Sequence, residues 1–157
     1  MTVRLRPMTA SEISAFAQHQ QGKYVADRVA AGETPAHAQE QADQQWERYF
    51  PAGGAADGHR LHHVVDGAEV VGQLWLGPSP DGKPGADWIY YIEVDEAVRG
   101  RGYGRAAMLL AEQDARQHGA VELGLNVFGP NKVARKLYES VGYEATAINM
   151  VKQLPPH

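Results

Sequence analysis

The sequence contains no cysteine among its 157 residues. Disulfides, thiolate nucleophiles and cysteine-based zinc sites are therefore excluded. No apolar run approaches the roughly 20 residues that a membrane-spanning helix needs, and the first residues, MTVRLRPM, hold no stretch apolar enough for a signal peptide. These absences predict a soluble, cytoplasmic protein without a membrane partner.

A strong charge of either sign is also missing, since the formal net charge is −4 at pH 7. Duplex binding needs a basic footprint, so we expect no nucleic-acid partner. His59, His62 and His63 lie close together in the sequence, but no carboxylate stands at a spacing that completes a metal site, and we predict no metal. The length and the apolar fraction of 43% suit one domain spanning residues 1–157.

Local patterns predict ten elements. Thr9-x-x-Glu12 is a capping box, and Thr34-Pro35 places a hydroxyl before a proline at the first helical position, so helices are expected to begin after each. Gly22 is expected to weaken the first helix, and Asp66-Gly67 to form a hairpin turn. The expected strands cover 2–6, 61–65, 69–76, 87–94, 121–128 and 143–154, and the expected helices cover 11–31, 35–50, 103–118 and 131–141. The order β-α-α-β-β-β-α-β-α-β predicts an α/β fold, a mixed sheet with helices on both faces in a single domain.

A glycine-rich turn, Arg99-Gly100-Arg101-Gly102-Tyr103-Gly104, separates the strongest strand from a helix. Glycines let a backbone approach a ligand closely, and the first N–H groups of a helix attract anions. Arg99, Arg101 and Arg105 add cations that suit phosphate oxygens. The turn therefore predicts a phosphate site, with a solvated loop as the alternative.

Two common classes of phosphate-binding motif do not fit this turn. No P-loop motif occurs in the chain. Gly102-x-Gly104-x-x-Ala107 formally matches a dinucleotide-binding fingerprint. That fingerprint normally opens a βαβ unit, whereas four predicted strands precede the turn in this chain. The acidic residue expected about twenty positions later would be Glu122, which begins a strand instead of ending one. A dinucleotide-binding domain is therefore disfavoured.

Two motifs together resemble the GNAT superfamily of N-acetyltransferases. Arg99, Gly102 and Gly104 match its Arg/Gln-x-x-Gly-x-Gly/Ala signature, and 92–99 (IEVDEAVR) is similar to the strand and bulge before it. Asn131-x-x-Ala134-x-x-Leu137-Tyr138-x-x-x-Gly142-Tyr143 is similar to the second motif of the superfamily. The resemblance covers about residues 60 to 150.

The resemblance implies an acetyl-CoA-dependent N-acetyltransferase with acetyl-CoA as co-substrate and a small-molecule or peptide amine as acceptor. A non-catalytic acyl-CoA-binding module on the same fold is the alternative, and a homodimer is an open option. Backbone groups of Ile92 and Val94, left free by a bulge, would pair with the pantetheine arm. The implied cofactor-binding residues are Ile92, Val94, Arg99, Gly100, Arg101, Gly102, Tyr103, Gly104, Arg105, Asn131, Ala134 and Tyr138.

The resemblance further implies catalytic roles. Tyr138 would protonate the departing CoA thiolate, although its apolar helical stripe also suits a core tyrosine. The general base is predicted to be Glu93, which is the charged residue inside the central strand; pairing with a cation on the other side of the sheet is its alternative. Tyr90, Tyr91 and a water held by Asn126 remain further candidates for the base.

Overall fold

The computed structural model describes residues 2–156, which form two compact units, one up to Asn126 and one from Val127 onward. The first unit contains all five strands, whereas the second contains a single helix, α4 (Lys132–Ser140). The elements of the first unit are, in order, β1 (Val3–Pro7), α1 (Ala10–Ala30), α2 (Pro35–Tyr49), the 3-10 turn η1 (Pro51–Gly53), β2 (Arg60–Asp66), β3 (Glu69–Pro78), β4 (Ala86–Val94), the 3-10 turn η2 (Glu96–Val98), α3 (Tyr103–Gln117) and β5 (Glu122–Leu125).

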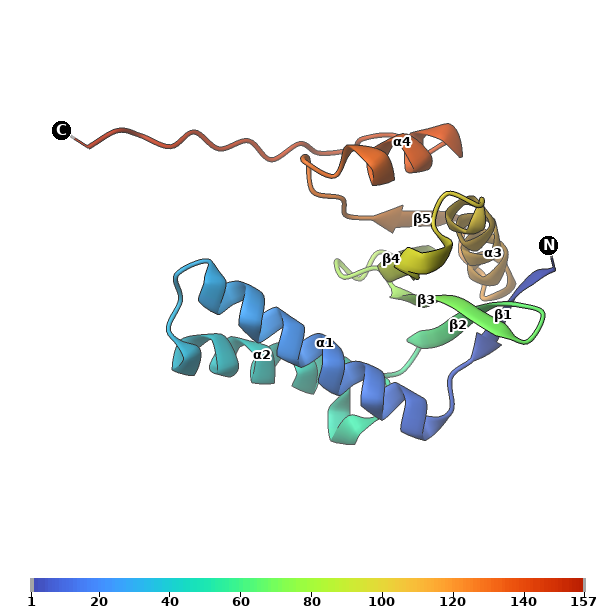
Figure 1. The fold of residues 1–157 in the computed structure, drawn as a ribbon, viewed down its shortest axis with the longest axis horizontal. Coiled ribbons are helices and arrows are strands. Elements are labelled where there is room, and N and C mark those ends of the chain that lie inside the picture. Colours follow the sequence, from blue (N-terminus) through green and yellow to red (C-terminus); the bar gives the residue numbers. More distant parts are fainter. Residues whose placement is uncertain (1, 157) are drawn as a thin grey trace. The chain divides into compact units, whose positions relative to one another are not determined.

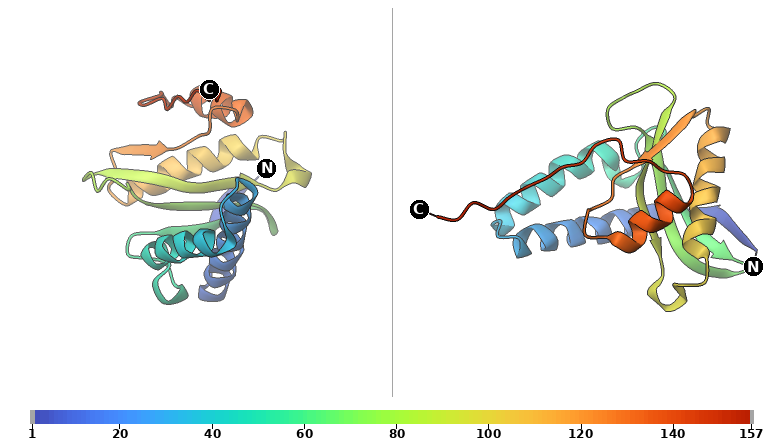
Figure 2. Two further views of the ribbon diagram at one scale, coloured as in Figure 1. Left: turned by 90° about the vertical axis from the view of Figure 1, so that its left-hand side faces the viewer. Right: turned by 90° about the horizontal axis from the view of Figure 1, so that it is seen from above.

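The strands form one mixed sheet in the order β1-β2-β3-β4-β5. β1 to β4 pair antiparallel, and β5 joins β4 in parallel. Figures 1 and 2 show α1 and α2 on one face of this sheet and α3 on the other. The predicted α/β fold, with a mixed sheet and helices on both faces, is confirmed. Within residues 2–156, no helix combines the length and apolar character that crossing a bilayer requires.

Capping signals set the helix starts as the sequence predicts. The Thr9 side chain accepts a hydrogen bond from the Glu12 N–H, and the Glu12 carboxylate accepts one from the Thr9 N–H. These bonds satisfy two donors that a helix start leaves open. Thr34 caps α2 in the same way, with Pro35 at its first position. Gly22 does not interrupt α1, which runs through it without a break.

Each face of the sheet has its own apolar core. Toward α1 and α2, a cluster forms from Met8, Phe16, Ala17, Phe50, Leu61 and Trp75. Successive strand side chains point to opposite faces, so Leu74 and Leu76 face α3, where Met108 is likewise fully buried. The two cores fix the sheet between its helices.

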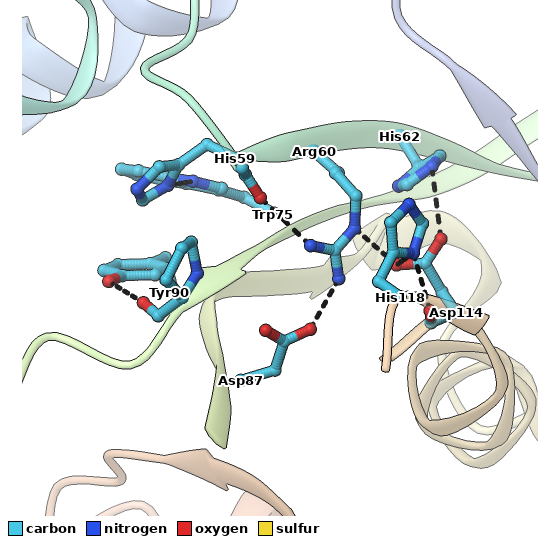
Figure 3. Close-up of polar contacts among 10 residues, drawn as sticks. His59, Arg60, His62, Trp75, Asp87, Tyr90, Asp114 and His118 are labelled. Carbon is cyan, nitrogen blue, oxygen red and sulfur yellow. Dashed lines mark hydrogen bonds and ion pairs between the residues drawn. The ribbon is translucent and has the colours of Figure 1, made fainter. Parts of the chain in front are cut away.

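One arginine links three elements on the α3 face. Arg60 of β2 forms ion pairs of 2.7 Å with Asp87 of β4 and with Asp114 of α3 (Figure 3). The side chains of Arg60, Asp87 and Asp114 are only 15%, 13% and 12% exposed. His62 and His118 lie within 4.0 Å and 3.7 Å of the Asp114 carboxylate. This network joins the start of β4 to β2 and α3.

Four sequence expectations need correction. Residues 143–154 form no strand: Ile148 and Met150 are exposed, so the apolar alternation there buries neither side chain. β5 ends at Leu125 instead of residue 128. β3 runs on to Pro78 instead of ending at residue 76. The hairpin turn is Gly67-Ala68, because Asp66 pairs with Glu69 and belongs to β2. The single domain over 1–157 stays a prediction.

The Arg60 network generates a prediction about stability. Arg60→Met should lower the free energy of unfolding by about 3–5 kcal/mol, because it leaves two largely buried carboxylates without their cation. Urea unfolding followed by circular dichroism measures this. Arg135→Met removes an exposed ion pair with Glu139 and serves as the control, at a cost of about 0.5 kcal/mol or less. Equal losses in the two variants would contradict a structural role for the network.

Candidate functional site

β4 has a bulge in its middle. Trp75 of β3 lies opposite Tyr91, and the next residue, Leu76, lies opposite Ile89, so Tyr90 is the extra residue. On its other edge β4 pairs with β5 only from Ala86 to Ile89. Beyond the bulge, from Tyr90 to Val94, β4 keeps β3 as a neighbour and has no strand on the other side within residues 2–156. This divergence creates a half-open strand edge.

The backbone directions along β4 are fixed by two contacts. The Asp95 N–H donates to the Val71 carbonyl at 2.8 Å, and the Glu93 carbonyl lies against Gly72, where a Cβ would clash with it. Residues 93 and 95 therefore point to β3. Because directions alternate along a strand, the N–H and C=O groups of Ile92 and Val94 point to the open edge. The prediction that these two residues present backbone groups agrees with this geometry, although the bulge lies earlier than expected.

Arg99 partly covers this open edge. Its Nε donates to the Val94 carbonyl at 2.9 Å, and its Nη2 lies 3.4 Å from Glu93 Oε1. The Arg99 side chain is 55% exposed, so the contacts lie in solvent and are individually weak. The Val94 carbonyl on the open edge thus accepts a hydrogen bond from an exposed arginine.

The glycine-rich turn leads directly into α3. Gly102 has φ +90° and caps the helix without a side-chain hydrogen bond, because glycine carries no side chain that could accept one from the first-turn N–H groups. A Cβ at Gly100 or at Gly102 would meet no protein atom within 4 Å. The space over these residues is therefore open, and Arg101 and Arg105 stand exposed beside it.

The Tyr103 side chain has a role that its motif position did not predict. It is buried, and its hydroxyl donates to Asp66 Oδ2 at 2.6 Å, which ties the start of α3 to the end of β2. Only its backbone N–H can therefore serve an anion. Its burial was not predicted, because the turn was interpreted for its glycines and arginines alone.

Three candidates for the base share the face of the sheet toward α1. Tyr90 and Tyr91 both pack against the core cluster beside Trp75, because a bulge turns two successive side chains to one side. Glu93 follows two residues later on that side. Its carboxylate accepts a hydrogen bond from the Tyr91 hydroxyl and forms the ion pair with Arg99. Asn126 is exposed and lies one residue beyond β5.

The remaining predicted site residues belong to the second unit. Asn131 caps α4, where its Oδ1 accepts a hydrogen bond from the Ala134 N–H at 3.2 Å. Tyr138 is half-buried on the same helix, with its ring 6.3 Å from that of Tyr143. Burial raises the pKa of Tyr138, so its phenol is protonated at neutral pH.

The three histidines do not gather around one point. His62 faces α3, His63 bonds to Glu12 of α1, and His59 Nδ1 accepts a hydrogen bond from the Trp75 indole. Burial lowers the pKa of both His59 and His62, which favours their neutral forms. Among the described residues, no group of three or more histidine and acidic side chains could hold a metal ion.

Comparison with known proteins identifies the family to which this chain belongs. A profile of the acetyltransferase (GNAT) family matches residues 23–143. The uncharacterised N-acetyltransferases YycN and YdgE of Bacillus subtilis (strain 168) are each 33% identical to this chain over 156 residues, covering 98% of it and 100% and 99% of the relatives. A crystal structure of YycN superposes with a TM-score of 0.82 at 32% identity, covering 99% of this chain and 100% of that one. The chain belongs to the GNAT family of acetyltransferases, as its two motifs predicted.

The bond between Tyr103 and Asp66 generates a prediction about pH. Donation from Tyr103, and after it from the Thr2 N–H, holds the pKa of Asp66 below its ordinary value. A lowered folded-state pKa adds stability that is present above the unfolded pKa of about 4 and is lost as the pH falls through the folded value. Tyr103→Phe should therefore melt earlier than the wild type at pH 7, and the difference should shrink at pH 3. Thermal unfolding at both pH values, with Asp66→Asn and the double variant, tests this. An equal gap at both would mean that only packing was lost.

Proposed function

We propose that this protein is an acetyl-CoA-dependent N-acetyltransferase that moves an acetyl group to a primary amine by direct attack on the thioester. The observation that carries the proposal is the half-open edge of β4, which presents Ile92 and Val94 immediately before the glycine turn. Membership of the GNAT family supports the same reading.

The residues of the first unit fit acetyl-CoA. The open-edge backbone groups of Ile92 and Val94 would pair with the amides of the pantetheine arm, much as a neighbouring strand would. The first-turn N–H groups of α3, with Arg101 and Arg105, would hold the pyrophosphate, since helix starts favour anions. The uncrowded space at Gly100 and Gly102 leaves room for it. When bound, acetyl-CoA supplies the activated acetyl thioester.

The acceptor ammonium must lose a proton before its nitrogen can attack. Burial, and after it Tyr49, raises the pKa of Tyr90 to about 12, and burial, with the bond to Glu93, raises that of Tyr91 to about 12. Both phenols are therefore protonated at neutral pH and can donate a proton but not accept one. Among the three side chains on the α1 face, this leaves Glu93 as the proposed general base, with a water held by Asn126 as the alternative. Tyr138 is the proposed general acid, which protonates the leaving thiolate.

The acceptor is proposed to be a small-molecule or peptide amine. The alternative is a non-catalytic acyl-CoA-binding module, favoured by the exposed and cation-paired state of Glu93. A screen separates the two: polyamines, amino acids, aminoglycosides and short peptides are incubated with acetyl-CoA, and free thiol is detected. Release that depends on one amine supports the enzyme. Binding of acetyl-CoA without release for every amine supports the module.

The turn generates a prediction about binding. Acetyl-CoA at 100 times its Kd should stabilise the wild type by about 2.7 kcal/mol. Gly102→Leu should abolish this stabilisation, because the side chain would enter the space proposed for the pyrophosphate. Thermal shift and calorimetry measure the effect.

Gly119→Leu is the matched control. Gly119 follows the other end of α3 with φ +86°, close to the +90° of Gly102, and its Cβ would likewise meet nothing within 4 Å. Both variants pay a similar backbone penalty, but only Gly102→Leu should lose binding. Retained affinity in folded Gly102→Leu would rule out the turn as the site.

Tyr138 generates a prediction about turnover. Tyr138→Phe keeps the ring and removes the hydroxyl, so kcat should fall by roughly two to four orders of magnitude if that hydroxyl donates the proton. The Kd for acetyl-CoA and the melting temperature should change little. Steady-state kinetics with the amine found by the screen, calorimetry and thermal unfolding measure the three quantities. Earlier melting with normal turnover would instead identify a core tyrosine.

A further inference from the structure

A row of polar side chains crosses the α1 face of the sheet. Arg6, His63, Gln73 and Glu93 are direct partners across four neighbouring strands, in that order. His63 Nε2 lies 3.0 Å from Glu12 Oε2 of α1, so a hydrogen bond closes that end of the row. At the other end, Glu93 stands at the open edge of β4. Its surroundings therefore decide the orientation of its carboxylate.

Tyr91 is the fixed neighbour of Glu93. The two residues lie two positions apart on one strand, and the Tyr91 hydroxyl donates to Glu93 Oε2. The Phe16 ring stands edge-on to the Tyr91 ring at 5.3 Å, and the Gln20 side chain bonds the hydroxyl from α1. Contacts from both α1 and the strand thus restrict Tyr91, whereas Glu93 itself is 42% exposed.

The second donor to Glu93 is less well held. Arg99 Nη2 lies 3.4 Å from Glu93 Oε1, and the arginine is more than half exposed. Its Nε also occupies the Val94 carbonyl, a group that the proposed cofactor site requires. Binding of the pantetheine arm would compete for that carbonyl and loosen Arg99. Tyr91 would then be the donor that remains on the carboxylate.

We propose that Tyr91 is a positioning residue for the acetyl transfer: its hydroxyl holds one oxygen of Glu93, so that the other oxygen is directed to the acceptor amine when Arg99 moves away. The proposal rests on the proposed function, in which Glu93 accepts the proton of the ammonium. Tyr91 itself transfers no proton.

The charged and titratable groups around this pair are few. Arg99 and Asp95 follow Glu93 along the chain, and the negative charge of Asp95 adds to the raised pKa of Tyr91. From β3 the neighbour is Gln73, and from α1 it is Gln20, neither of which titrates. The nearest charges across the sheet are His63 and Glu12, beyond Gln73. The phenol and the carboxylate therefore interact mainly with each other and with Arg99.

The first experiment needs no substrate. The phenol carbon of labelled tyrosines is titrated by NMR between pH 8 and 12.5, Tyr91→Phe assigns the Tyr91 signal, and circular dichroism marks the range in which the fold persists. In Glu93→Gln the Tyr91 midpoint should fall by roughly one pH unit, because a neutral acceptor replaces a carboxylate. Tyr90→Phe is the matched control: it removes the hydroxyl of the adjacent bulge tyrosine, which bonds to the Pro78 carbonyl, and should leave the Tyr91 midpoint in place. An unmoved midpoint in Glu93→Gln would overturn the proposal.

The second experiment uses acetyl-CoA and the amine found by the screen. Glu93→Gln should lower kcat/KM by roughly two to four orders of magnitude. Tyr91→Phe should lower kcat by roughly 10- to 100-fold with KM for acetyl-CoA unchanged.

The outcomes separate the two proposals. A shifted Tyr91 midpoint with a fully active Glu93→Gln would show a real hydrogen bond but overturn Glu93 as the base, and with it the catalytic role of Tyr91. An inactive Glu93→Gln with an unchanged kcat in Tyr91→Phe would keep the base and overturn the positioning role. If Tyr91→Phe fails to fold, the midpoint shift in Glu93→Gln and the kcat of Gln20→Ala, which removes the Gln20 hydrogen bond to the phenol, decide the question. A kcat that falls in Gln20→Ala with KM for acetyl-CoA unchanged supports the proposal, and an unchanged kcat contradicts it.

Discussion

The structure depends on one strand, β4, whose pairing changes along its length. Up to Ile89, β4 is paired on both edges, and the bulge at Tyr90 then separates it from β5. A regular strand would leave no backbone donor or acceptor available, because both edges of an interior strand are consumed by its neighbours. The bulge therefore leaves the second half of a structural strand with one unpaired edge. The proposed cofactor and base groups both follow from it.

The paired half of β4 is held by charge and the open half by aromatic packing. Arg60 binds Asp87 near the start of the strand and Asp114 on α3, where all three side chains are largely buried. Past the bulge, Tyr90 stacks on Trp75 at 5.0 Å and Tyr91 meets Phe16. Opposite faces of one strand are thus fixed by different interactions, so the unpaired edge can remain open without losing its place in the sheet.

Much of this could be predicted from the sequence, and the failures have physical causes. The helix starts followed from capping residues, which act within a few positions and are visible locally. The phosphate role of the glycine turn came from its glycines, arginines and helix start, and the backbone role of Ile92 and Val94 came from a resemblance in motif; both roles stay predictions. The expected strand over 143–154 was wrong, because alternation indicates a strand only where one face is buried, and Ile148 and Met150 are exposed. The Arg60 network joins residues far apart in the chain, and no local pattern reveals such a network. The bulge did leave a local signal, because the adjacent tyrosines at 90 and 91 interrupt the alternation of the strand.

The bulge also determines how this strand must be counted. Asp87 and Ile89 face α3, and beyond the extra residue the same face is taken by Ile92 and Val94. Odd and even positions exchange faces of the sheet at Tyr90. A sequence alignment that places a one-residue gap elsewhere in 86–94 would therefore match residues from opposite faces of the sheet. When the sequences of relatives are aligned to find the residue equivalent to Glu93, residues should therefore be counted from the bulge. Counting from the beginning of the strand can select a residue on the opposite face.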